Sequence, residues 1–429
     1  MKALLSVLIP LLLVGCSPAK RISRTLRIQP TYTDHFTGVA LYDPVRKKHL
    51  IQYNADKPFT PASNTKLFSF YAGLVSLRDS LPALRYAVRS DSLIFWGTGN
   101  PLLLHPDLPD TSALAFLRKR PERLFFSAEN YKGPRFGAGW AWDDYNDDYS
   151  AELASMPIYG NVLRFPKGKL LSTQIKPRQF ADSTSVLPDS KIGSGVRRME
   201  FANRFTRLTD VQKSQQDVPF RWSPGLVAQL LSDTLHRSVV LVNLPVPENT
   251  KLLRGSSADS LYKRMLHVSD NQFAEQVLFM ISAERSASML EPGVELRRIA
   301  DSLRLTTPEG RNAARWVDGS GLSRYNVFTP NVLIDLLIKI YALVPQQRLF
   351  TLLPAAGQSG TLRNMDMHGK PYVFAKSGSM TGVYNLSGYV LTKQNKLLYF
   401  SIMHNNFTQP VSEMRQRTAA LLKEIHEQF

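Results

Sequence analysis

Three short polar motifs, far apart along the chain, constrain its fold more than any other feature of the sequence. They are Ser63-Asn64-Thr65-Lys66, Ser269-Asp270-Asn271 and Lys376-Ser377-Gly378. The first opens an apolar stretch with helical spacing, the second directly precedes another, and the third lies in a predicted strand. We therefore expect a fold that brings a helix start, a loop and a strand together around one cleft.

The Ser-x-x-Lys pattern is weak evidence by itself, because it also occurs at residues 17–20 and 260–263. Context separates the three copies. Ser17 is predicted to lie in a tether without a helix, and Ser260 lies inside a helical stretch with no turn before it. Only Ser63 follows a strand and a proline and then starts a helix, which is the position that a nucleophile needs.

A serine and a lysine three positions apart on a helix share one face, so the Lys66 amine is within reach of the Ser63 hydroxyl. The amine must be neutral to accept a proton, and a nearby cation such as Lys376 together with partial desolvation lowers a lysine pKa. Backbone N–H groups of Ser63 and of Ser379 are predicted to hold an oxyanion. Gly378 is predicted to let a substrate approach the strand closely.

The ordered motifs resemble those of the penicillin-binding proteins. Further matches are Gly139-Trp140-Ala141-Trp142-Asp143-Asp144, Asp318-Gly319-Ser320-Gly321-Leu322-Ser323-Arg324, Gly360-Thr361-Leu362 and the segment 375–382. Together they resemble the class C, low-molecular-mass group, the type-4 D-alanyl-D-alanine carboxypeptidase/endopeptidases. The resemblance covers nearly the whole mature chain.

This resemblance implies roles for individual residues. Ser63 is the acylated nucleophile, Lys66 the general base and Ser269 a proton relay to the leaving amine. Asn271 binds the substrate amide. The remaining implied contacts are Lys376 and Ser377 on the terminal carboxylate, Arg324 on the peptide stem, and Asp143 and Asp144 on a stem amine. Ser377 stands where the family usually has threonine, and it keeps the hydroxyl.

The first residues predict export. Lys2 and the apolar run that follows are typical of a signal peptide over residues 1–15, too short to span a bilayer. Gly15 before the single cysteine, Cys16, resembles the lipobox of bacterial lipoproteins, with residues 16–30 as a tether. We thus expect a protein anchored by lipid on the periplasmic side of the envelope, in the outer membrane; the other interpretation of Cys16 is a buried thiol behind an ordinary secretion signal.

The net charge of +18 falls to +17 when Lys2 is removed with residues 1–15. Such a balance favours polyanionic surroundings. For an exported chain these are cell-wall polymers and anionic lipid headgroups rather than nucleic acid. No His-x-x-x-His or His-Glu-x-x-His pattern occurs, so no metal and no other cofactor is predicted.

The resemblance implies an α/β (α+β) transpeptidase- or β-lactamase-like domain, with an antiparallel sheet between helix layers, formed by residues 31–78 and 255–429. Alternating and β-branched residues predict a hairpin over 36–42 and 50–53. Helices are expected over 258–266, 271–281, 331–343 and 409–427, and strands over 389–391 and 397–403. Residues 79–254 are expected to form an inserted, mainly β region.

The expected activity is that of a serine-type D-alanyl-D-alanine carboxypeptidase/endopeptidase. It would act on peptidoglycan stem peptides and be inhibited covalently by β-lactams. Two alternatives remain open from the sequence. One is a β-lactamase or D-amino-acid esterase of the same fold, and the other is a peptidoglycan-binding lipoprotein that has lost its activity.

Overall fold

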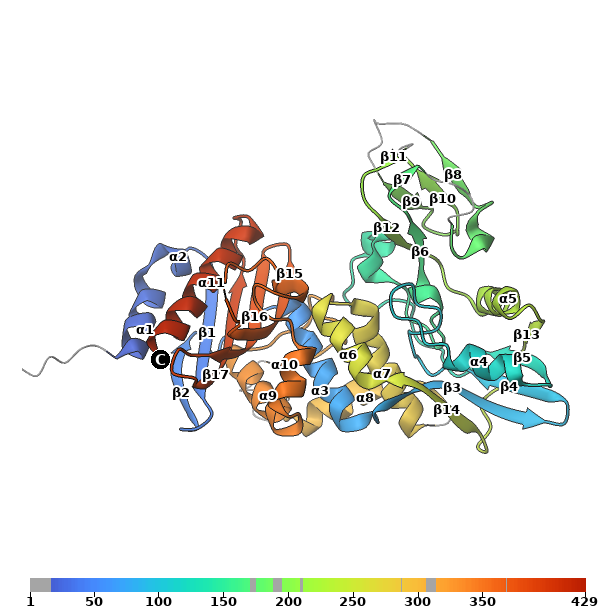
Figure 1. The fold of residues 1–429 in the computed structure, drawn as a ribbon, viewed down its shortest axis with the longest axis horizontal. Helices are drawn as coiled ribbons and strands as arrows, with labels where there is room; N and C mark the ends of the chain where they lie inside the picture. Colours follow the sequence, from blue (N-terminus) through green and yellow to red (C-terminus); the bar gives the residue numbers. More distant parts are fainter. Residues whose placement is uncertain are drawn as a thin grey trace, which may run out of the picture.

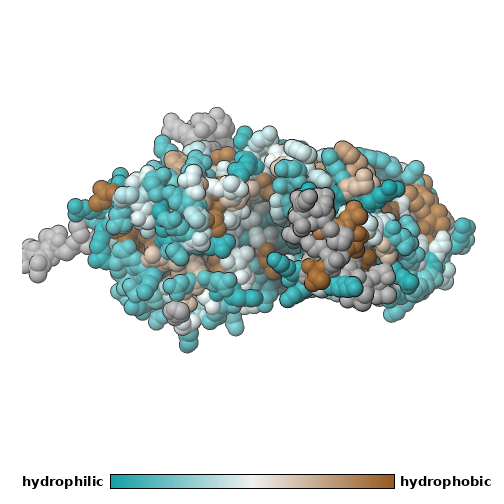
Figure 2. Space-filling model, turned by 90° about the horizontal axis from the view of Figure 1, so that it is seen from above, coloured by the Kyte–Doolittle hydropathy of each residue, from teal (hydrophilic) through white to brown (hydrophobic). Residues whose placement is uncertain are grey.

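The computed structural model describes residues 17–169, 175–187, 195–208, 211–286, 288–305, 314–367 and 369–429, without the side chain of Gln212. The predicted signal peptide (1–15) and the predicted lipidation site, Cys16, lie outside these residues. Among the described helices, none combines the length and the apolar character needed to span a bilayer. On the face drawn in Figure 2, hydrophilic residues predominate and hydrophobic ones form small, separate groups.

A five-stranded sheet in the order β15-β16-β17-β1-β2 forms the centre of the first half of the molecule. All of its pairings are antiparallel, and Leu41 on β1 lies opposite Phe400 on β17. The predicted hairpin is confirmed as β1 and β2. The strands are β1 (Phe36–Asp43), β2 (Lys48–Tyr53), β15 (Val373–Met380), β16 (Val383–Leu391) and β17 (Leu397–Asn405).

Helices cover both faces of this sheet, which confirms the predicted layers (Figure 1). Successive side chains of a strand point to opposite faces, so Val39 and Leu41 enter one core and Ala40 the other. The first core is closed by α1 (Pro18–Ile28), α2 (Pro30–Thr33) and α11 (Val411–Gln428). The second is closed by α3 (Lys66–Ser76), α6 (Ala258–His267), α7 (Asn271–Arg285), α8 (Pro292–Ser302), α9 (Pro330–Leu343) and α10 (Gln346–Leu352).

The predicted tether over residues 16–30 is wrong for its described part. Residues 18–28 form α1, and Ser17 stands at its N-cap position. Ile22 and Leu26 are fully buried against the sheet and α11. Two buried side chains four positions apart form too short an apolar stripe to stand out among polar neighbours, and packing on the sheet stabilises the helix. A helix start therefore does not by itself separate Ser63 from Ser17.

The inserted region leaves the first half after α3 and returns to it at α6 (Figure 1). Its main sheet, in the order β13-β5-β4-β3-β14, is mixed, because β4 and β13 both pair with β5 in parallel. The last strand runs to Ser257 and so crosses the predicted end of the insertion at residue 254. This sheet and its helices are β3 (Ser80–Arg89), β4 (Ser92–Trp96), β5 (Arg123–Ser127), β13 (Val239–Leu241), β14 (Lys251–Ser257), α4 (Ser112–Lys119) and α5 (Pro224–Leu235).

Short strands form the outer part of the insertion, at the top right of Figure 1. They build small sheets in the orders β8-β10-β9, β11-β7 and β12-β6. Their bounds are β6 (Val162–Phe165), β7 (Gly168–Lys169), β8 (Thr184–Val186), β9 (Val196–Arg198), β10 (Phe205–Arg207), β11 (Val211–Gln212) and β12 (Gln216–Pro219). Strands thus make up most of the regular structure described in the insertion, which confirms the predicted mainly β region, with α4 and α5 added to it.

Candidate active site

Ser63 lies in a tight turn, η1 (Ala62–Thr65), directly ahead of α3. The turn packs against β15 so closely that a Cβ atom on Gly378 would lie 2.5 Å from the Pro61 carbonyl oxygen and 2.9 Å from the Ser63 nitrogen. Gly378 is buried at this contact. It thus makes room for the turn that carries Ser63, whereas the sequence suggested that it makes room for a substrate.

The Lys66 amine is fully buried and has three partners. It donates to Ser63 Oγ at 2.8 Å, to Asn271 Oδ1 at 2.6 Å and to the Ser320 carbonyl oxygen at 2.8 Å. The amide of Asn271 is oriented in turn, because its Nδ2 donates to the Tyr149 carbonyl oxygen at 2.9 Å. The first two motifs therefore meet at one nitrogen atom.

Burial lowers the pKa of Lys66 from 10.5 to about 8, against the opposing effect of the nearby carboxylates of Asp318, Glu275 and Asp270. Burial also places the pKa of Lys376 well below its usual value, and repulsion from Lys66 lowers it further. Desolvation is thus the main cause of the lowered pKa of Lys66, and it is one of the two causes that the sequence led us to expect. The repulsion between the two lysines acts on Lys376.

The third motif reaches the second through Lys376. Its fully buried amine donates to Ser269 Oγ at 3.0 Å and to the Ser377 carbonyl oxygen at 2.6 Å. Ser269 has a φ of +63°, in the left-handed region that is uncommon for a serine. Ser377 Oγ donates to Thr361 Oγ1 at 2.7 Å. Thr361 belongs to η7 (Gly360–Leu362), which the sequence singled out without a role.

A cleft of about 590 Å³ opens above these groups. It is lined by Ala62, Ser63, Gly139, Ala141, Asp143, Asp144, Tyr149, Ser269, Asn271, Gly321, Leu322, Arg324, Ser379, Met380 and Thr381. The predicted nucleophile, both predicted oxyanion residues and the predicted stem contacts thus share one cavity. Lys376 and Ser377 do not line it, so their predicted contact with a carboxylate stays a prediction.

Residues of opposite charge line this cleft. The pKa of Asp144 is raised by burial and by the neighbouring carboxylates of Asp147 and Asp143, and Arg324 partly offsets the effect. Arg324 is exposed and donates to the Thr381 carbonyl oxygen at 3.4 Å. A substrate that carries both an amine and a carboxylate therefore finds a partner for each in this cleft.

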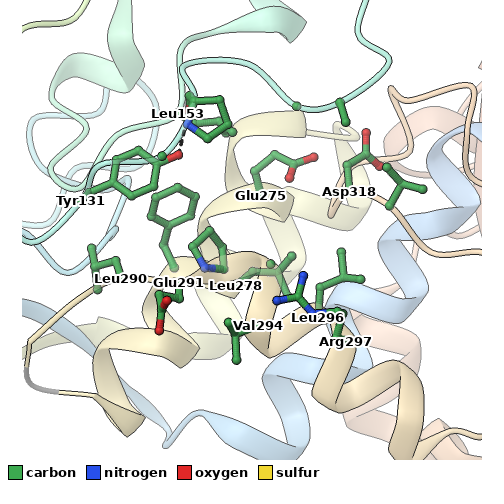
Figure 3. A pocket seen from close by; sticks show the side chains of 18 of the residues that line it. Tyr131, Leu153, Glu275, Leu278, Leu290, Glu291, Val294, Leu296, Arg297 and Asp318 are labelled. Atoms are coloured by element: carbon green, nitrogen blue, oxygen red, sulfur yellow. Dashed lines mark hydrogen bonds between the residues drawn. The ribbon is translucent and has the colours of Figure 1, made fainter.

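Two buried carboxylates behind the cleft were not predicted to have a role. Asp318 accepts from the backbone N–H groups of Gly321 and Ser323, and Glu275 from those of Gly319 and Ser320. Both line a second cavity, drawn in Figure 3. The available signal for Glu275 was an acidic residue one turn after Asn271 in a helix that continues with apolar residues.

Comparison with known proteins finds a family similar to part of this chain. The sequence model of the D-Ala-D-Ala carboxypeptidase 3 (S13) family matches residues 222–425, which include the second and third motifs. The match covers 204 of the 429 residues, just under half of the chain, and the chain is similar to this S13 family over that segment. Among the described residues, no group of three or more His, Cys, Asp and Glu side chains is arranged to hold a metal ion.

Relatives of this chain carry names consistent with that match. A D-alanyl-D-alanine carboxypeptidase of an Actinomadura species is 26% identical over 477 residues, which cover 94% of this chain and 86% of that protein. The penicillin-sensitive carboxypeptidase A of Dictyostelium discoideum is 37% identical over 155 residues, only 33% of this chain and 28% of that protein. The crystal structure of penicillin binding protein 4 from Haemophilus influenzae superposes with a TM-score of 0.72 at 22% identity. The superposition covers 91% of this chain and 96% of the Haemophilus influenzae protein, so the two share a fold.

Proposed function

We propose that this protein is a serine-type peptidoglycan hydrolase that cleaves D-alanyl-D-alanine bonds, both at the end of stem peptides and in cross-links, through an acyl-enzyme on Ser63. One observation carries the proposal. The Lys66 amine lies 2.8 Å from Ser63 Oγ, and its other two partners are oxygen atoms that act only as acceptors here.

A neutral amine has two N–H bonds and one lone pair. Asn271 Oδ1 and the Ser320 carbonyl take the two N–H bonds, so the lone pair is left to face the Ser63 hydroxyl. As Ser63 Oγ bonds to the scissile carbonyl carbon, its proton passes to Lys66. The oxyanion is held by the backbone N–H groups of Ser63 and Ser379, at the start of a helical turn and at the edge strand β15.

Collapse of the intermediate breaks the C–N bond, and the leaving amine must receive a proton. Ser269 lines the cleft and its hydroxyl accepts a hydrogen bond from the Lys376 amine, which suits the proposed relay of that proton. Water then attacks the Ser63 ester by the reverse proton route and releases the shortened peptide. β-lactams would acylate the same hydroxyl, with their ring amide in place of the D-alanyl bond.

The proposed location is the cell envelope, on the periplasmic side. Support comes from the sequence alone, through the lipobox-like pattern that ends at Cys16. A peptidoglycan substrate requires the cleft to be exported, which is consistent with that pattern.

The test compares the full-length protein with Ser63→Ala and with Ser260→Ala, which removes the serine of an exposed Ser-x-x-Lys pair on α6. Each is incubated with a D-Ala-D-Ala pentapeptide and with labelled penicillin, and released D-alanine and adduct mass are followed. We expect Ser63→Ala to lose at least about 10⁴-fold in turnover and all adduct, and Ser260→Ala to match the parent. Turnover that survives in Ser63→Ala would refute the proposal. Rapid loss of the penicillin adduct would favour a β-lactamase, and an inactive parent a binding protein.

A further inference from the structure

Glu275 occupies an unusual position one helical turn after Asn271 on α7. Its side chain is buried, with 5% of the residue exposed. Its two oxygens accept from two consecutive backbone N–H groups, Oε2 from Gly319 at 2.9 Å and Oε1 from Ser320 at 2.7 Å. Figure 3 shows its carboxylate and that of Asp318 on the same side of the second cavity.

Ser320, which Glu275 holds by its N–H, is the residue whose carbonyl receives the Lys66 amine at 2.8 Å. A continuous set of hydrogen bonds thus leads from Glu275 through Ser320 and Lys66 to Ser63 Oγ. A shift of the Ser320 backbone would therefore change the direction in which the Lys66 amine points.

Asp318 anchors a different part of the same loop. Its carboxylate accepts from Gly321 N, Ser323 N, Asn326 Nδ2 and Trp140 Nε1 at 2.6–3.0 Å. It leaves the N–H groups of Gly319 and Ser320 to Glu275. The loop is also packed on α7, since a Cβ atom on Gly319 would lie 2.4 Å from the Ala274 carbonyl oxygen.

We propose that Glu275 is a positioning residue for the catalytic base: it fixes the Gly319–Ser320 backbone so that the Ser320 carbonyl aims the Lys66 lone pair at Ser63. The inference rests on the proposed function. Glu275 does not line the catalytic cleft, so it acts on the rate of acylation and not on substrate binding.

The charge of Glu275 adds a second, measurable effect. Lys66 from α3, Asp318 from the loop and Tyr131 from the loop after β5 face it, and Lys132, Glu291 and Arg297 line the same cavity of about 450 Å³. Burial and the Asp318 carboxylate raise the pKa of Glu275, and its ionised form raises the pKa of Lys66. Because the pKa of Glu275 is raised, its charge is present mainly at the upper end of the pH range, and removal of the charge lowers the pKa of Lys66 there.

The experiment measures penicillin acylation and pentapeptide turnover of Glu275→Gln across the pH range. A glutamine has one acceptor oxygen for two N–H groups, so we expect kcat to fall by roughly 10- to 100-fold with little change in KM. The upper end of the acidic limb of the acylation profile, where Glu275 is ionised in the parent, moves to lower pH. Glu275→Asp keeps the charge, so its limb stays in place while its rate falls.

The matched control is Glu295→Gln, which changes a second buried glutamate that is paired with Arg285 and Arg298 and does not line the catalytic cleft. We expect it to lower Tm while leaving kcat and the pH profile unchanged. The inference is overturned if Glu275→Gln lowers only Tm, or if its rate and pH limb match the parent. If Glu275→Gln does not fold, Glu275→Asp decides, because a purely structural role predicts an unchanged rate per folded molecule. Turnover that persists in Ser63→Ala would instead overturn the proposed function itself, whatever the result for Glu275.

Discussion

At the scale of single residues, the site depends on a lysine whose amine is removed from water. Lys66 has no exposed surface, and the loss of its hydration shell destabilises the charged amine more than the neutral amine. Three acceptor atoms compensate part of that loss. The result is an amine that can lose its proton near neutral pH and is already directed at a hydroxyl.

The acylation rate should follow the protonation of Lys66. Its pKa is lowered to about 8, and only the neutral amine accepts the Ser63 proton. We expect the rate constant for penicillin acylation to rise about tenfold per pH unit below this value and to level off above it. Stopped-flow acylation between roughly pH 6 and 9 checks this, and a flat profile would rule out Lys66 as the base.

At the scale of elements, the site is a contact between the turn η1 and the strand β15. The two meet backbone to backbone at Gly378, and Gly321, with φ +84°, approaches η1 even more closely from another loop. Side chains on either glycine would occupy the space of the turn. These glycines are therefore requirements of packing around Ser63.

Replacement of Gly378 by alanine should separate β15 from η1. The new Cβ atom would meet the Pro61 carbonyl oxygen at 2.5 Å, and backbone cannot yield as a flexible side chain would. We expect a loss of about 1–3 kcal/mol in the free energy of unfolding and a large fall in acylation rate. Denaturant unfolding and penicillin labelling measure the two.

Gly225→Ala is the matched control, since a Cβ atom there has no neighbour within 4 Å. It lies in the first turn of α5, which contributes no residue to the lining of the cleft. It should be neutral or stabilise the protein by up to about 1 kcal/mol. Equal behaviour of the two variants would contradict the packing argument.

At the scale of the whole molecule, ion pairs link the insertion to the second motif. Arg164 on β6 pairs with Asp107 at 2.6 Å, Asp107 with Arg264 on α6 at 3.0 Å, and Arg264 with Asp270 at 3.1 Å. Asp270 stands between Ser269 and Asn271. The orientation of the insertion is thus coupled to a segment that carries two of the proposed functional residues.

Asp107→Asn should weaken this link in a pH-dependent way. Hydrogen bonds from Arg164 lower the pKa of Asp107 from 3.8 to about 2. A carboxyl group whose pKa is lower in the folded than in the unfolded protein stabilises the fold at pH values above its unfolded pKa. This stabilisation is lost as the pH falls toward 2. The Asp107 side chain is 36% exposed, so we expect about 1 kcal/mol at neutral pH.

Thermal unfolding of the parent and of Asp107→Asn from neutral pH to pH 2 measures the effect. The difference in Tm should shrink between about pH 4 and 2. Asp182→Asn, which alters an exposed carboxylate in the insertion, should show little difference at any pH. A Tm difference for Asp107→Asn that is constant with pH would mean that ionisation of Asp107 is not the cause.

The sequence by itself determined the motifs, the periodic elements around them and, through its resemblance to a family, the general fold. These are local or recurrent properties, since spacing along the chain fixes which side chains share a helix face or a strand face. It did not predict that residues 18–28 fold on the sheet, because two apolar residues are too few to indicate an amphipathic helix unless the surface that they cover is known. Glu275, Ser320 and the packing role of Gly378 were likewise decided by tertiary structure. Their partners lie far away in the sequence, and the burial that gives them their effect exists only once the chain has folded.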